Sequence, residues 1–228
     1  MRTFALLVAS LGTIQAHDII TTKITFSKEI SRIIYTRCAT CHREGGSAFS
    51  LMKYDEARPW AKAIKEEVLE RRMPPWEAIK GFGEFRDDRG LSQEELETIS
   101  SWVEGGAPEG EPKYLPALPK LTAWQDPPTP AASSEWTAGD GAKLAASSQV
   151  LAIRPKNLKA GSSVQVYAVR PDSSVEPLLW IYQYKPQFDR TYYYAAPLKL
   201  PAGTRIEMSP ADSGTVGLFV QRAASAHR

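Results

Sequence analysis

Two cysteines and one histidine lie together in the segment Cys38-Ala39-Thr40-Cys41-His42. Two thiols at this spacing can add to the two vinyl groups of a haem, and the adjacent histidine can then bind the iron. The chain has no other cysteine, so this pair needs a local explanation. The motif predicts one covalently attached haem c, held by Cys38 and Cys41, with His42 as an axial iron ligand.

Three other interpretations of the cysteine pair compete with haem attachment. A thioredoxin-like redox pair would follow a strand and open a helix, whereas a helix is expected before Cys38. A zinc site needs four ligands, and outside the motif the only histidines are His17 and His227, near the chain ends. The third interpretation is a pair without chemical function. Haem attachment is favoured over all three.

A methionine is the expected second axial ligand, because a low-spin electron carrier fills the sixth iron position with a soft, neutral group. Met52 follows His42 by only ten residues, which leaves little chain to cross a haem. Met208 lies in a predicted strand, where a methionine commonly fills a core. Met73 precedes Pro74-Pro75, whose fixed backbone can present a thioether rigidly. We therefore predict Met73 as the ligand.

The elements that would position these residues fall into two regions. Residues 18–110 contain three amphipathic helical patterns, which start after Ser27, Asp55 and Ser92. Residues 111–148 are rich in Pro, Ala and Ser and predict a linker. Residues 149–222 alternate short apolar runs with turn signals, which is typical of an antiparallel sandwich. The predicted fold class is α + β in separate domains: an all-α mono-haem cytochrome c fold, then a small antiparallel β-sandwich.

The first 16 residues predict a cleaved signal peptide. Arg2 supplies a positive start, an apolar run extends from Phe4 to Ile14, and Ala16 offers a small residue for cleavage. A spanning helix needs roughly 20 apolar residues, and this run has about half that number. We therefore expect a periplasmic or secreted protein without stable membrane insertion. The net charge of +2 is too small to favour a nucleic-acid partner.

Residues 26–110 resemble the cytochrome c domain that precedes the copper type II, ascorbate-dependent monooxygenase module in a group of bacterial proteins. The resemblance implies His42 and Met73 as axial ligands. In that family a proline usually follows the haem histidine within several residues, and its carbonyl can orient the imidazole; the loop Arg43 to Phe49 contains no proline. The matching stretches are Cys38-Ala39-Thr40-Cys41-His42-Arg43, Ser50-Leu51-Met52-Lys53-Tyr54-Asp55-Glu56-Ala57-Arg58-Pro59-Trp60, Met73-Pro74-Pro75-Trp76, and Leu91-Ser92 with Trp102-Val103-Glu104-Gly105-Gly106-Ala107-Pro108-Glu109-Gly110.

The second region resembles, more faintly, the C-terminal copper domain of the same monooxygenases. In that domain a His-x-His pair just after an Arg-Pro, together with a methionine, holds the copper. This chain has Arg154-Pro155-Lys156-Asn157-Leu158 at the corresponding point. Lysine is charged at neutral pH and leucine has no donor atom, so neither side chain can hold copper. The resemblance therefore implies a degenerate domain, and no copper is expected.

These observations predict an exported cytochrome that exchanges electrons with redox partner proteins. One alternative is an accessory redox subunit that delivers electrons to a dedicated periplasmic oxidoreductase. Another is a haem enzyme or sensor, which would need an open sixth iron position and is disfavoured by a Met73 ligand. Copper monooxygenase activity is not expected.

Overall fold

The computed structural model describes residues 23–121, 128 and 133–222. The predicted signal peptide, residues 1–16, lies outside these ranges, as do His17 and His227. Within the described ranges, no helix has the length and apolar character needed to cross a membrane.

Short helical elements make up most of the regular structure before residue 115. A capping box opens α4, because the Ser92 hydroxyl accepts from the Glu95 amide while the Glu95 carboxylate accepts from the Ser92 amide. The first helical stretch begins one residue earlier than the predicted cap, and Thr25 rather than Ser27 caps it. The elements are η1 (Phe26–Ile30), α1 (Ser31–Ile33), η2 (Ile34–Cys38), α2 (Tyr54–Ala57), η3 (Arg58–Trp60), α3 (Ala61–Leu69), α4 (Gln93–Glu104) and η4 (Pro112–Tyr114).

A small apolar core joins these helices. Trp102 of α4 is fully buried beside Phe26, and its indole nitrogen donates to the Pro108 carbonyl at 3.0 Å. The Tyr54 hydroxyl donates to the Ala107 carbonyl at 3.0 Å. The Phe26 and Ser27 amides donate to the Pro108 and Glu109 carbonyls, which holds the chain after α4 against the first helical stretch.

Among the described residues of the second half of the chain, seven antiparallel strands form two sheets. The four-stranded sheet has the order β1-β7-β2-β5, and the three-stranded sheet has the order β4-β3-β6. Side chains from both sheets share one core, as expected of a sandwich. The strands are β1 (Ser134–Ala138), β2 (Ser148–Lys156), β3 (Val164–Val169), β4 (Val175–Ile181), β5 (Tyr192–Leu200), β6 (Arg205–Ser209) and β7 (Thr215–Arg222).

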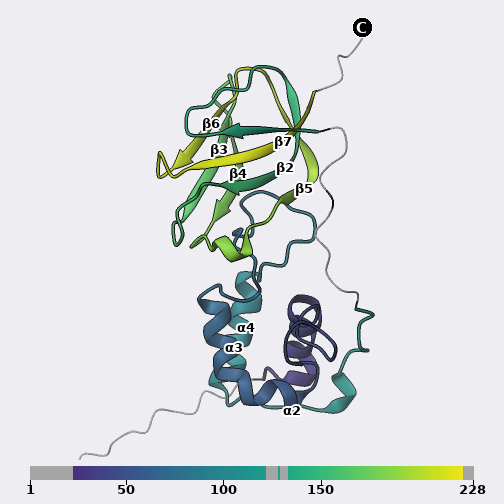
Figure 1. Cartoon of the computed structure of the whole chain (residues 1–228). Helices are drawn as coiled ribbons and strands as arrows, with labels where there is room; N and C mark the ends of the chain where they lie inside the picture. The colour runs from purple at the N-terminus through teal and green to yellow at the C-terminus, as the bar shows by residue number, and fades with distance from the viewer. Residues whose placement is uncertain (1–22, 122–127, 129–132, 223–228) are drawn as a thin grey trace, which may run out of the picture.

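Two segments that the sequence predicts to lie outside the sandwich are part of it. Strand β1 lies inside the predicted linker and pairs with β7. Trp76, Ala78 and Phe85, which precede α4, are buried in the core of the sandwich. Figure 1 shows helices α2, α3 and α4 gathered at one end of the molecule and the strands at the other, with the chain after α3 reaching toward the strands.

The predicted fold class is therefore wrong. The described residues are mostly antiparallel β-structure in two sheets, and the helices before them are short rather than parts of an all-α cytochrome domain. The physical reason lies in the chain after α3. Pro74, Pro75, Gly81 and Gly83 prevent helix there, and the apolar side chains between them are buried by strands instead of by helices.

Candidate functional site

All four residues predicted to bind haem line one cavity. Cys38 ends η2, Cys41 and His42 belong to the turn that follows, and Met73 comes from the loop after α3. The cavity has a volume of about 430 Å³, within the range of small-molecule sites. Most of its other lining side chains are apolar, among them Leu51, Trp60, Ala63, Ile64 and Val68.

The turn after η2 brings the cysteines and the histidine to the same wall. The amides of Cys41 and His42 both donate to the Cys38 carbonyl, at 3.1 and 2.9 Å. The loop that follows folds back, since the Ala48 amide donates to the Cys41 carbonyl and the Leu51 amide to the His42 carbonyl. The backbone of the motif is thus fixed by hydrogen bonds on both sides.

Both cysteines are free thiols. Although Cys38 keeps some exposure toward the cavity, burial by surrounding atoms raises the pKa of its thiol to about 12, with the Glu95 carboxylate adding to the rise. Reactive redox cysteines have a lowered pKa instead, because the thiolate is the nucleophile. This environment does not favour the dithiol interpretation.

The His42 imidazole is oriented by a main-chain carbonyl. Its Nδ1 lies 3.0 Å from the Phe49 carbonyl oxygen, which can only accept, so Nδ1 carries the proton. In the tautomer with the proton on Nδ1, Nε2 has the free lone pair, the arrangement typical of a metal-binding histidine. The Phe49 ring also packs edge-on against the imidazole at 5.0 Å. Phe49 therefore supplies the carbonyl whose source was undetermined in a loop without proline.

Met73 follows the end of α3 and is partly exposed, at 38%. Its amide donates to the Glu67 carbonyl at 3.1 Å, and Arg72 pairs with the Glu67 carboxylate at 3.0 Å. Pro74 and Pro75 line the cavity beside it. The ligand candidate thus lies on a loop that is held to the last turn of α3.

The other two candidate methionines lie elsewhere. Met208 is 5% exposed in the core of the sandwich, as its strand position predicted. Met52 is not among the residues that line the cavity, and its carbonyl accepts from the Tyr35 hydroxyl at 3.0 Å. Of the three, Met73 is the one that shares a cavity with His42.

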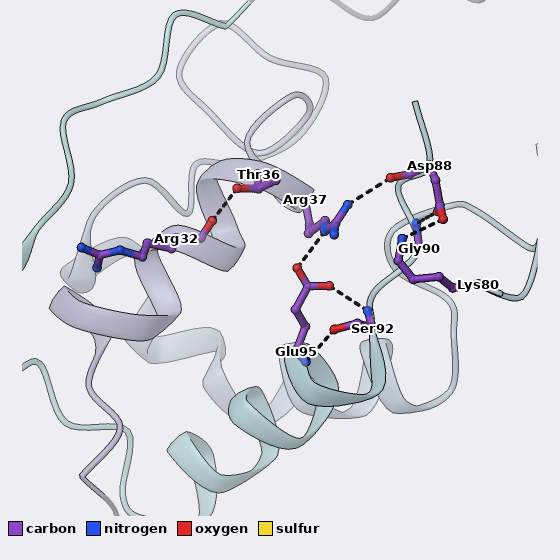
Figure 2. Close-up of polar contacts among 8 residues, drawn as sticks. All are labelled: Arg32, Thr36, Arg37, Lys80, Asp88, Gly90, Ser92 and Glu95. Atoms are coloured by element: carbon purple, nitrogen blue, oxygen red, sulfur yellow. Dashed lines mark hydrogen bonds and ion pairs between the residues drawn. The ribbon is translucent and has the colours of Figure 1, made fainter. Parts of the chain in front are cut away.

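A polar network around Arg37, which lines the cavity, connects η2 to α4 and to the loop at Asp88. Figure 2 shows Arg37, which precedes the first cysteine, between Glu95 of α4 and the loop at Asp88. Its Nε donates to the Glu95 carboxylate at 2.9 Å and an Nη to the Asp88 carbonyl at 3.0 Å. The Asp88 carboxylate in turn pairs with Lys80 at 2.7 Å and accepts from the Gly90 amide. Sequence patterns did not single out Arg37, although its place beside Cys38 was a usable signal.

Two large aromatic rings flank the cavity mouth. Phe49 and Trp60 are 50% and 47% exposed, and their ring centroids lie 4.7 Å apart. Both residues line the cavity. Aromatic surface that is left open beside an apolar cavity can be covered by a flat apolar ligand.

The donor set fits an iron porphyrin better than a bare metal ion. Within the part of the chain that the structure describes, no group of three or more His, Cys, Asp or Glu side chains could hold a metal. A porphyrin iron needs only two axial ligands from the protein, such as one imidazole and one thioether. His42 and Met73, which line one cavity from two parts of the chain, have the side chains that such a pair requires.

The positions that the resemblance assigns to copper ligands have other contacts. Lys156 pairs with Glu135 at 3.1 Å and donates to the Thr137 hydroxyl. Leu158 is buried in the core of the sandwich. The absence of copper binding stays a prediction. No protein-family model, curated protein or solved structure matches this chain.

Proposed function

We propose that this chain is an exported c-type cytochrome that carries one covalent haem c and transfers electrons between partner proteins. One observation carries the proposal: Cys38, Cys41, His42 and Met73 line a single, largely apolar cavity although they come from two separate parts of the chain. The attachment motif and the resemblance to the cytochrome c domains described above support the same function.

The two thiols attach the cofactor covalently. Each sulfur would add across one vinyl double bond of the haem: a carbon–sulfur bond would form, and the thiol proton would move to the other vinyl carbon. This reaction needs no oxidant, because the addition is redox-neutral. Since Cys38 and Cys41 lie one turn apart with hydrogen-bonded backbone, both sulfurs are offered from the same wall.

The remaining ligands tune the site for electron transfer. The bound haem supplies the reversible one-electron chemistry of its iron. The Phe49 carbonyl holds the His42 proton on Nδ1 and so reserves Nε2 for the iron. The neutral thioether of Met73 would bind the haem iron and would raise its reduction potential. With Met73 bound, the iron would have no open position for a substrate or a gas, which disfavours an enzyme or a gas sensor.

Export is part of the proposal and rests on the signal-like sequence of residues 1–16. The expected location is the periplasm or the medium. Fractionation of cells that express the full chain tests it, and recovery of haem protein in the cytoplasm alone would contradict it.

The accessory-subunit alternative is favoured by one specific observation, the contact between the Met73 loop and the β-sandwich. A sandwich that binds one enzyme could then affect the haem ligand. Purification of the chain with a stoichiometric partner enzyme would favour the accessory role. Rapid electron exchange with several unrelated redox proteins would favour the general carrier.

The direct test is a visible spectrum of the full chain, expressed in a host with haem-attachment machinery. We expect a low-spin cytochrome spectrum and a haem that stays with the polypeptide in acidic acetone. A protein that contains no haem, or that releases all of its haem to the acetone, contradicts the proposed function.

A further inference from the structure

The chain after Met73 crosses to the sandwich and adds to strand β4. We call residues 76–86 the bridging segment. The Ile79 amide donates to the Trp180 carbonyl at 2.9 Å, and the Tyr182 amide donates to the Glu77 carbonyl at 3.0 Å. This end of the bridging segment therefore extends the three-stranded sheet at its β4 edge.

The other end of the bridging segment pairs with β5. The Ala195 amide donates to the Glu84 carbonyl at 2.8 Å, and the Arg86 amide donates to the Tyr193 carbonyl at 2.7 Å. Because β5 is an edge of the four-stranded sheet, one short segment covers an edge of each sheet. The sandwich would expose both edges without it.

A buried carboxylate lies at the start of this segment. Glu77 is 4% exposed, and one of its carboxylate oxygens accepts from the Lys185 main-chain amide. Its second carboxylate oxygen, the Lys185 ammonium and an Arg190 nitrogen are buried without a hydrogen-bond partner. Asp189 and Tyr192 also interact electrostatically with the Glu77 carboxyl. Burial of an acid at such a site costs free energy unless the acid is neutral or its charge is paired and hydrogen-bonded.

The chain between Glu77 and Met73 is short and stiff. Pro74 and Pro75 fix its backbone, and the Trp76 amide donates to the Pro74 carbonyl at 2.7 Å. The Trp76 ring packs edge-on against Tyr192 of β5 at 5.0 Å and lies beneath the Arg190 guanidinium. On the other side of the loop, the Met73 amide is bonded to α3. Met73 is therefore held between two anchors, one on α3 and one on the sandwich.

We propose that Glu77 is a positioning residue through which the β-sandwich holds Met73 in the wall of the cavity. This inference rests on the proposed function and gives the sandwich a role in it: the sandwich fixes the sixth ligand. The prolines transmit the position of Trp76 and Glu77 to the thioether. Loss of the Glu77–Lys185 contact frees the far end of the loop, and the iron then loses Met73 more easily.

The test compares three variants of the full haem-loaded chain. Glu77→Ala removes the acceptor for the Lys185 amide, and Glu77→Gln retains an acceptor of the same shape. Glu84→Ala is the matched control, because Glu84 is exposed on the same segment. The readouts are the weak red charge-transfer band of thioether-ligated ferric haem, the reduction potential and CO binding by the reduced protein.

We expect Glu77→Ala to lose most of the charge-transfer band, to lower the potential and to bind CO about tenfold more tightly, the factor expected for one buried hydrogen bond. Glu77→Gln should keep the band, and Glu84→Ala should match the wild type. If Glu77→Ala does not fold, Phe82→Ala gives the second test. Phe82 is half-buried against Tyr167 and Trp180, so its loss loosens the same segment mildly and should weaken the band.

Three results overturn the inference: an unchanged band and unchanged CO affinity in Glu77→Ala, equal losses in Glu84→Ala, or, where Glu77→Ala fails to fold, an unchanged band in Phe82→Ala. A wild type with covalent haem and the band, combined with any of these results, contradicts the positioning role alone. A wild type without covalent haem contradicts the proposed function itself.

Discussion

The Nδ1 atom of His42 lies 3.0 Å from the main-chain carbonyl oxygen of Phe49. A carbonyl oxygen can only accept, so this contact places a proton on Nδ1 of the one described histidine. Phe49 also carries an exposed ring, which lies beside Trp60 at the cavity mouth. A single residue thus orients the predicted iron ligand with its backbone and bounds the site with its side chain.

The first prediction concerns covalent attachment. Replacing Cys38 or Cys41 by Ala removes one of two thioethers, so each single variant should hold less haem, and the double variant should hold none covalently. The measurement is the haem that remains with the polypeptide after acidic acetone extraction. Met52→Ala is the control and should retain all of its haem. Covalent haem in the double variant would contradict the assignment of both cysteines.

How much of this site could be predicted from the sequence depends on the range of each interaction. The Cys38–His42 motif and the proline-flanked Met73 are local signals, and they identify four residues that line one cavity. The role of Phe49 is a main-chain role, and residue type carries no information about which carbonyl accepts a hydrogen bond. The sequence alone therefore could not identify the carbonyl that takes the place of the missing proline carbonyl.

The fold was predicted less well, for a related reason. The apolar residues Trp76, Ala78 and Phe85 lie between helical patterns in the sequence, which predicts a helical domain around them, but they are buried in the sandwich. Their partners are on β4 and β5, about a hundred residues later in the chain, and no local pattern reports such pairing. Strand β1 was missed because the Pro-rich composition around it is typical of a linker.

The second prediction concerns the sixth ligand. Met73→Ala should abolish the weak red charge-transfer band, lower the reduction potential and let the reduced protein bind CO, because the thioether is the group that raises the potential. Absorption spectra and a redox titration measure these changes. Met208→Ala and Met52→Ala should keep the band, since neither residue lines the cavity. Loss of the band in either control, with its retention in Met73→Ala, would show that another methionine binds the iron.

The third prediction concerns copper. Lys156 is paired with Glu135, and Leu158 is in the core of the sandwich, so the purified chain should bind no stoichiometric copper. Metal analysis after mild chelation measures it. Lys156→His is an informative variant: one imidazole beside Glu135 is still too few ligands, so copper should stay absent. Stoichiometric copper in the wild type would revive the monooxygenase interpretation.

The fourth prediction concerns Arg37. Its side chain is about one-fifth exposed and joins the helix before Cys38 to Glu95 and to the Asp88 carbonyl. Arg37→Ala should lower the free energy of unfolding by roughly 1–3 kcal/mol, because it leaves half-buried acceptors unpaired. Urea unfolding measures the change. Lys28→Ala breaks an ion pair whose lysine is 59% exposed and should cost less than about 1 kcal/mol. An equal loss of unfolding free energy in the two variants would show that Arg37 does not stabilise the cavity walls.

The last prediction concerns pH and Glu77. Burial raises the pKa of its carboxyl from 4.5 to about 7, against the opposing effect of the Lys185 amide and the Lys185 and Arg190 charges. The folded protein therefore binds a proton that the unfolded chain releases near its ordinary pKa. The stability that the folded protein gains from binding this proton is fully present below pH 4.5 and is lost as the pH rises through about 7. The free energy of unfolding should fall by up to about 3 kcal/mol over this interval.

Glu77→Gln removes this pH dependence, because the amide is neutral at every pH while it can still accept from Lys185. Urea unfolding at several values between about pH 5 and pH 8 should give a nearly flat stability for the variant and a falling one for the wild type. Asp189→Asn is the control, since the pKa of Asp189 is also raised by burial. It should keep most of the decline. A decline as steep in Glu77→Gln as in the wild type would assign the titration to another group and leave Glu77 charged in the folded protein.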